Sequence, residues 1–225
     1  KLLTQKKGKS KNMITNKLRI GIIDLKINNI FSIFKATQVA NFKCKIIGKK
    51  ENYKKYDLII LPGVGSFKEA MKKIKKEDID KKIYEFVEDN SKKLFGICLG
   101  MQLLFERSEE FGNTRGLSLL SGTVEKFNKK KVKIIPHMNW NKIHFKNLNN
   151  TSVLKTFDKK DFYFVHSFYC KIKKKNNLLS YTKHENLKFC SSVRHENILG
   201  TQFHPEKSGK IGINFLKKIE KFYEK

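Results

Sequence analysis

The fold is decided by one short stretch of the chain, Gly96-Ile97-Cys98-Leu99-Gly100-Met101-Gln102. Residues 93–97 read as a buried strand, and apolar spacing predicts a helix over residues 99–107. A glycine two residues to each side of Cys98 lets the chain turn sharply, as in the nucleophile elbow G-x-S-x-G. We therefore expect a nucleophilic cysteine at a strand-to-helix turn. The alternative is an ordinary buried cysteine whose glycine neighbours relieve crowding.

Strands and helices alternate around this turn through the first half of the chain. The residue pattern predicts further strands over 18–24, 43–47 and 56–61, and helices over 29–39, 67–76 and 79–90, with Ser66 as a candidate cap. Such alternation indicates right-handed βαβ units and a parallel sheet covered on both faces.

Short strands dominate after Gly112. They are expected over 117–120, 123–127, 131–135, 162–166, 168–172, 178–182, 187–194 and 198–203, and an amphipathic helix over 209–223 closes the chain. The sequence thus predicts an α/β fold, with a mostly parallel central sheet flanked by helices and a largely antiparallel β portion in the second half. We interpret residues 1–17 as a basic leader without order and residues 18–225 as one domain.

A catalytic cysteine needs a base, and the candidate is His204 in the segment Thr201-Gln202-Phe203-His204-Pro205-Glu206. His204 follows a predicted strand, at the edge where open α/β sheets place their chemistry. Glu206 can orient the imidazole and stabilise its protonated form. A solvated loop is the plainer interpretation of such a pair, but the cysteine elbow and the histidine each supply what the other lacks.

Backbone donors for a reaction intermediate are expected at two turns. Free N–H groups at a helix start favour an anion, and the N–H of Leu99 would point to the reacting atoms. The turn Pro62-Gly63-Val64-Gly65 follows another strand, and its glycines let backbone N–H groups approach a reacting oxygen. Turns of this kind are also common as purely structural features.

Composition excludes several classes of protein. The net charge is +28, but 45 of the 49 basic residues are lysine, spread over the whole chain, whereas specific phosphate and base recognition favours arginine. We therefore expect no specific nucleic-acid partner. No apolar run approaches the roughly 20 residues of a membrane helix, and no signal-peptide pattern is present. We therefore expect a cytoplasmic protein that does not associate with a membrane. Four scattered cysteines are interpreted as thiols, with no metal spacing.

Taken together, the Cys98 elbow, the Pro62–Gly65 turn and His204-Pro205-Glu206-Lys207-Ser208 resemble the class I (triad) glutamine amidotransferases. Further segments, residues 136–141, 163–168 and 200–203, are similar to the glutaminase subunits of imidazole glycerol phosphate synthases. The resemblance covers residue 18 to the end of the chain. It implies an amidotransferase that hydrolyses L-glutamine and passes ammonia to a (β/α)₈ cyclase subunit, in a heterodimer of histidine biosynthesis, with no cofactor and no metal.

The resemblance also implies a role for each matching residue. The triad would be Cys98 as nucleophile, His204 as general base and acid, and Glu206 as its orienting group. The oxyanion hole would use Leu99 with Gly63 or Val64, the glutamine site Gly65, Gln102, Ser167 and Phe168, and the partner interface Asn29, Trp140, Tyr163 and Lys207.

The sequence departs from the family pattern near the partner-facing side. The usual Asp-Tyr-Gly-x-Gly-Asn is here Asp24-Leu25-Lys26-Ile27-Asn28-Asn29, so we expect this loop to follow a different path. Asn139 replaces a glycine, and Phe168 stands where tyrosine is common. A subunit that feeds ammonia to another synthase, such as one that amidates surface-polysaccharide sugars, is therefore the alternative. A basic binding module without catalysis and an inactive scaffold are the other hypotheses.

Overall fold

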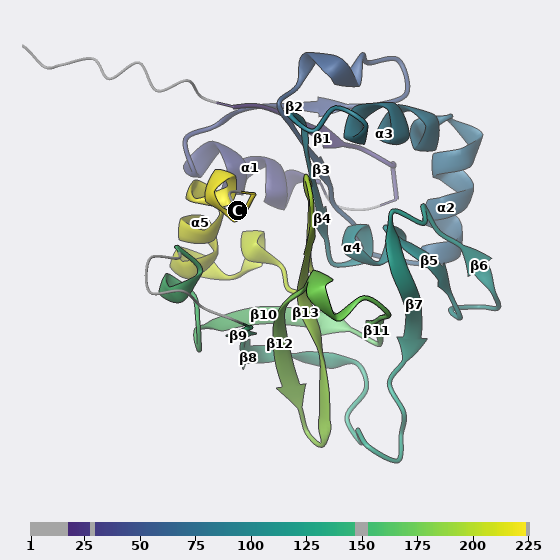
Figure 1. Cartoon of the computed structure of the whole chain (residues 1–225), viewed down its shortest axis with the longest axis vertical. Helices are drawn as coiled ribbons and strands as arrows, with labels where there is room; N and C mark the ends of the chain where they lie inside the picture. Colours follow the sequence, from purple (N-terminus) through teal and green to yellow (C-terminus); the bar gives the residue numbers. More distant parts are fainter. Residues whose placement is uncertain (1–17, 28–29, 147–152, 224–225) are drawn as a thin grey trace, which may run out of the picture.

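The computed structural model describes residues 18–27, 30–146 and 153–223. The predicted leader over 1–17 and the candidate interface residue Asn29 lie outside the described residues. The described chain forms the expected α/β fold, with helices on both sides of a central sheet (Figure 1).

The central sheet is parallel in its first part. Its strands β2 (Lys43–Ile47), β1 (Arg19–Ile23), β3 (Leu58–Leu61), β4 (Lys93–Ile97) and β14 (Ile198–Thr201) lie side by side in that order. Beyond β14 the sheet continues antiparallel with β13 (Leu187–His195), β12 (Leu178–His184) and β9 (His144–Phe145). Because Ile97 pairs with Thr201, the carboxyl ends of β4 and β14 meet at one edge of the sheet.

Helices cover both faces of this sheet. One face carries α1 (Phe31–Val39) and α5 (Gly209–Lys217), and the other carries α2 (Phe67–Lys76), α3 (Ile79–Val87) and α4 (Leu99–Leu103) (Figure 1). Alternate residues of β3 serve the two layers: Ile59 and Leu61 pack with one cluster of buried side chains, whereas Leu58 and Ile60 pack with the other. Near-continuous apolar strands are what a doubly covered parallel sheet requires.

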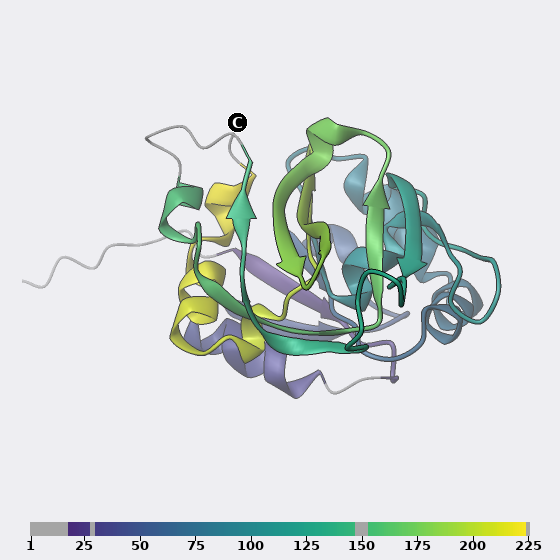
Figure 2. The ribbon, with the colours of Figure 1, turned by 90° about the horizontal axis from the view of Figure 1, so that it is seen from below.

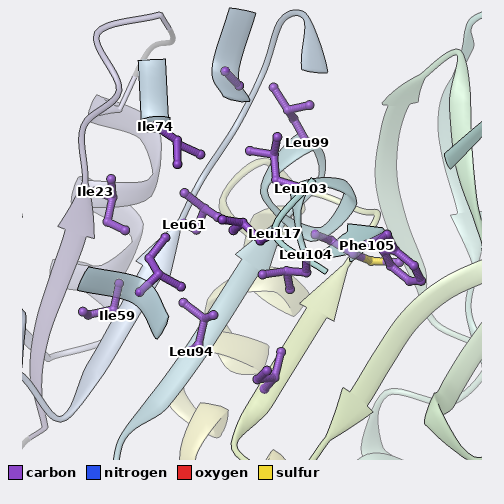
Figure 3. Close-up of a cluster of buried hydrophobic side chains, with 14 of the residues drawn as sticks. Ile23, Ile59, Leu61, Ile74, Leu94, Leu99, Leu103, Leu104, Phe105 and Leu117 are labelled. Carbon is purple, nitrogen blue, oxygen red and sulfur yellow. The ribbon is translucent and has the colours of Figure 1, made fainter. Parts of the chain in front are cut away.

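The short helix α4 lies deep in one of these layers. Figure 3 shows its side chains Leu99 and Leu103 among strand residues such as Leu61 and Leu94. Every residue from Leu99 to Leu103 is buried. The helix that follows Cys98 is therefore fixed on all sides, which holds the turn before it in one place.

Two smaller sheets complete the described chain. One consists of β11 (Phe168–Ile172), β7 (Leu120–Lys126), β5 (Phe105–Ser108) and β6 (Thr114–Arg115), in that order. The other is an antiparallel ribbon of β8 (His137–Lys142) and β10 (Asp161–His166). Figure 2 shows this ribbon passing the yellow carboxyl-terminal segment, and β10 contacts α5. Among the described residues, no helix is both long enough and apolar enough to cross a membrane.

Several predicted elements are wrong. The helix predicted over 99–107 ends at Leu103, because Phe105 is fully buried and begins a strand that pairs with β7. The segment predicted as a strand over 131–135 is not one: the N–H groups of Lys133 and Ile134 donate to the Glu185 carboxylate, each at 2.9 Å. Strand β8 was not predicted, since most of its side chains are exposed and few are apolar.

The candidate cap Ser66 also behaves differently from the expectation. Its side chain makes no capping hydrogen bond at the start of α2; instead, the N–H of Phe67 donates to Glu110 Oε2 at 2.7 Å. The helices predicted over 79–90 and 209–223 are shorter than expected. The first ends at Val87, and the second ends at Lys217 before a single turn, η5 (Ile219–Phe222).

The loop after β1 holds a lysine in an unusual backbone conformation. Lys26 stands where the family has glycine, and it nevertheless adopts the left-handed region, with φ of 59°. Its N–H donates to Asp24 Oδ1 at 2.8 Å and its Nζ pairs with Asp24 Oδ2 at 2.7 Å. Asp24 therefore stabilises the conformation that a lysine would otherwise disfavour.

Candidate active site

Cys98 lies on the strained turn that the sequence predicts. Its backbone has φ of 53° and ψ of −109°, and its N–H donates to the carbonyl of Thr201 at 2.7 Å. The turn requires glycine at its flanking positions, because a Cβ on Gly100 would lie 1.8 Å from the carbonyl oxygen of Leu61. A Cβ on Gly96 would likewise lie 2.8 Å from Gly100. The nucleophile elbow is thus built by close packing of the β4–α4 turn onto β3.

The predicted base follows the neighbouring strand. β14 ends at Thr201, and His204 follows it immediately before the turn η4 (Pro205–Lys207). His204 Nδ1 lies 2.7 Å from Glu206 Oε1, and the two side chains are 1% and 8% exposed. His204 Nε2 is buried and has no hydrogen-bond partner within the described part of the chain. One imidazole nitrogen is therefore oriented by a carboxylate, and the other remains available for proton transfer.

Both Cys98 and Glu206 affect the pKa of His204. Burial disfavours the charged imidazole, but the negative charges of Cys98 and Glu206 outweigh it and raise the pKa of His204 to about 10. The site therefore favours a protonated His204 imidazole, the form that can give a proton to a leaving group.

This raised pKa predicts how stability depends on pH. The folded protein binds a proton on His204 that the unfolded chain, with an ordinary histidine, releases near pH 6.5. The stabilisation is therefore complete below pH 6.5 and is lost as the pH rises toward 10. Between pH 6.5 and 10, the free energy of unfolding measured in urea should fall by at least about 1 kcal/mol more for the unaltered protein than for the His204→Gln variant, which lacks the titrating group. Parallel curves for the two proteins would contradict the assignment.

A cavity of about 930 Å³ opens beside Cys98. Seven of the predicted site residues line it: Cys98, Leu99, Val64, Gly65, Gln102, Ser167 and Phe168. Gly63 does not line it; the Cα of Gly63 packs so closely on α4 that a Cβ there would lie 2.7 Å from Leu99 Cβ. Gly65 has φ of 108°, a conformation that suits glycine.

Charged groups of both signs also line the cavity, and sequence reasoning did not single them out. They are Glu109, Glu110, Lys126 and Lys129. One oxygen of Glu110 accepts the N–H of Phe67 at the start of α2. A wall with carboxylates and ammonium groups suits a zwitterionic ligand.

Gln102 is held in a network of buried amides. Its Nε2 donates to the carbonyl of Phe168 at 2.9 Å and to Gln202 Oε1 at 3.1 Å. Gln202 was not predicted as a site residue, although it lies two positions before His204. Its Nε2 donates to Cys98 Sγ at 3.6 Å. The sequence signals for it were its place between strand β14 and the histidine and its membership of the similar segment 200–203.

A group of stacked histidines supports the wall of the cavity. His166 lies in the cavity lining, and its Nδ1 donates to the Phe168 carbonyl at 2.8 Å. His166 Nε2 lies 3.0 Å from His137 Nδ1, and the His137 ring stacks on His184 with 4.1 Å between centroids. Burial, with a smaller contribution from the neighbouring His184, lowers the pKa of His137 to about 3. Burial also lowers the pKa of His166, so His137 and His166 are neutral side chains within an aromatic core.

Three predicted interface residues lie close to the His204 segment. Tyr163 pairs with Trp140 across the β8–β10 ribbon, with ring centroids 5.9 Å apart, and Trp140 is 46% exposed. The carbonyl of Tyr163 accepts the N–H of His204 at 3.0 Å. Lys207 is exposed on η4. An aromatic pair, of which Trp140 is exposed and Tyr163 half-buried, thus lies one hydrogen bond from the candidate base.

Comparison with known proteins shows which family the chain belongs to. Residues 21–219 match the family model described as glutamine amidotransferase class-I. The chain belongs to this family. Among curated relatives of this amidotransferase, imidazole glycerol phosphate synthase subunit HisH of Thermotoga maritima is 39% identical, over 90% of this chain and 96% of the relative. The protein of the same name from Bacillus subtilis is 40% identical, over 90% and 95%.

Solved structures share the fold of this amidotransferase. A structure described as PurLQS from Thermotoga maritima superposes with a TM-score of 0.72 at 22% identity, over 92% of this chain and 100% of the other. A crystal structure described as a glutamine amidotransferase gives 0.65 at 17% identity, over 90% and 98%. The central sheet, with its elbow after β4, is therefore the class I glutamine amidotransferase architecture.

Proposed function

We propose that this protein is the glutaminase subunit of an imidazole glycerol phosphate synthase, and that Cys98, His204 and Glu206 are its catalytic triad. One observation carries the proposal: a cysteine on a left-handed elbow opens into a cavity, beside a histidine whose far nitrogen is bound by a buried glutamate. The names of relatives at about 40% identity support the choice of synthase.

The geometry supports a short mechanism. His204 takes the Cys98 proton on Nε2, and the sulfur attacks the side-chain amide carbon of glutamine. The oxygen that becomes negative is stabilised by the N–H of Leu99, with Val64 or Gly63 of the opposite turn as the second donor. His204 then donates its proton to the departing ammonia, and water hydrolyses the thioester to glutamate. Glu206 holds the imidazole in the required tautomer throughout.

The glutamine side chain would enter the cavity beside Gly65, Gln102, Ser167 and Phe168. The zwitterionic end of the substrate fits the rim, where carboxylate and ammonium groups are both present. Four free cysteines agree with the cytoplasmic location that we expect for this enzyme.

The test of this function is glutamine hydrolysis by the purified chain, alone and mixed with the (β/α)₈ cyclase subunit of its organism and that subunit's acceptor nucleotide. Strong stimulation by both would support the proposed synthase. Hydrolysis that ignores this partner would redirect the ammonia to another synthase, the alternative that Lys26 and Asn139 leave open. Absence of hydrolysis together with an unreactive Cys98 would overturn the proposal.

We further propose that the partner docks on Trp140, Tyr163 and Lys207. Removal of the exposed ring in Trp140→Ala should weaken subunit binding by roughly 30-fold or more, because large aromatic side chains dominate interface energies. The dissociation constant measured by calorimetry checks this. Tyr84→Ala on α3 is the control, since Figure 1 shows α3 at the opposite end of the molecule from β8. Unchanged affinity in Trp140→Ala would exclude this surface.

A further inference from the structure

Gln202 lies between the nucleophile and the glutamine pocket, and the mechanism above does not use it. Its side chain is completely buried, with 0% exposure, just beyond the end of β14. It contacts Cys98 Sγ through Nε2 and Gln102 through Oε1. Its backbone N–H donates to the carbonyl of Ser191 at 2.9 Å, so the position of its Cα is fixed by the sheet.

The direction of each hydrogen bond in this network follows from chemistry. The carbonyl of Phe168 can only accept, so the atom of Gln102 that lies 2.9 Å from it is the amide nitrogen. That same nitrogen lies 3.1 Å from Gln202, which must therefore present its oxygen. The remaining amide group of Gln202 is its NH₂, and this group faces the sulfur of Cys98. The sulfur consequently has a fixed N–H donor on this side.

On another side, the sulfur faces a hydrogen-bond acceptor, which favours the thiol and not the thiolate. Cys98 Sγ lies 3.9 Å from the carbonyl of Val165, which can accept from a thiol but offers nothing to a thiolate. When the S–H bond breaks, its proton passes to His204 and its electron pair stays on sulfur. The hydrogen bond from the Gln202 N–H to the sulfur then becomes stronger, because hydrogen bonds to ionised groups are roughly twice as strong as neutral ones.

We propose that Gln202 is a positioning residue that holds the Cys98 sulfur through its amide N–H and couples it to the glutamine pocket through Gln102. The assignment deepens the proposed function and rests on it, since it concerns the same nucleophile. It predicts that Gln202 acts on the reactivity of Cys98, whereas its loss leaves the pocket wall in place, because Gln102 keeps its bond to Phe168.

The experiment measures the reactivity of Cys98 directly, without glutamine or a partner. The full chain is treated with iodoacetamide, and the alkylation rate of each cysteine is followed by peptide mass spectrometry. Half-buried Cys44 serves as a reference within the same molecule. The variants Gln202→Met and Gln202→Leu both remove the donor but differ in shape, so that one remains informative if the other fails to fold. Gln38→Met, on the exposed face of α1, is the matched control.

Both variants should slow alkylation of Cys98 roughly tenfold relative to Cys44, the effect of losing a hydrogen bond to a charged group. A purely structural role predicts the reverse, because looser packing would expose a side chain that is now 6% exposed and speed its reaction. In the glutaminase assay with partner, kcat should fall about tenfold while KM changes less than about threefold.

Different failures have different meanings. If Cys98 of the unaltered chain reacts no faster than Cys44, the proposed function and the role of Gln202 both fall. If unaltered Cys98 reacts quickly and the two Gln202 variants react equally quickly, only the role of Gln202 is overturned. The same holds if the variants raise KM and leave kcat unchanged.

Discussion

Replacing Cys98 by alanine or serine should reduce glutamine hydrolysis by at least about 10⁴-fold, in the presence of partner and acceptor. Alanine removes the sulfur that attacks the substrate in the proposed mechanism, and a serine hydroxyl is a much weaker nucleophile than a thiolate. Glutamate release measured by a coupled dehydrogenase assay checks this. The size of the loss follows from the way triad members act as a unit.

Controls separate chemistry from folding in this experiment. Cys44→Ser changes a half-buried cysteine on β2, on the far side of β1 and β3 from the elbow, and should leave hydrolysis within about twofold. Cys98→Ser should bind the partner with unchanged affinity, since the side chain is buried. Hydrolysis retained in Cys98→Ala would remove this residue from the mechanism and leave the elbow as a packing feature only.

The sequence predicted the elbow because its information is local. Gly96, Cys98 and Gly100 lie within five residues, and the structure confirms that the turn needs a positive φ and bare backbone. The alternation of strands and helices likewise predicted the parallel sheet. His204 and Glu206 could be paired with Cys98 because parallel strands end at a common edge, which is a rule of topology and needs no distances.

What the sequence could not give were contacts between side chains far apart in the chain. The Glu185 carboxylate takes the N–H groups that would have made residues 131–135 a strand, and nothing in that segment reveals it. Gln202 is one of several polar residues after a strand, and only the fixed carbonyl of Phe168 shows which way its amide points. The histidine group around His137 came from three separate strands.

The second large effect is expected from a substitution that disturbs the close packing of the elbow. Gly100→Ala would place a methyl group 1.8 Å from the carbonyl oxygen of Leu61, at the end of β3. Neither group is the flexible end of a side chain, so α4 or β3 must shift as a whole. We expect the free energy of unfolding to fall by about 3 kcal/mol or more, at the upper end for overpacking. Thermal unfolding should then occur roughly 6–12 °C lower.

The same shift should cost activity, since the N–H of Leu99 and the sulfur of Cys98 move with α4. Gly48→Ala is the matched control, because a Cβ there meets no atom within 4 Å and its φ is one that alanine accepts. It should unfold within about 0.5 kcal/mol of the unaltered protein. Equal stability of the two variants would show that the β3–α4 contact can relax. In that case the left-handed conformation of Cys98 would need a different support, and the turn at Gly63, packed against Leu99, is the nearest one.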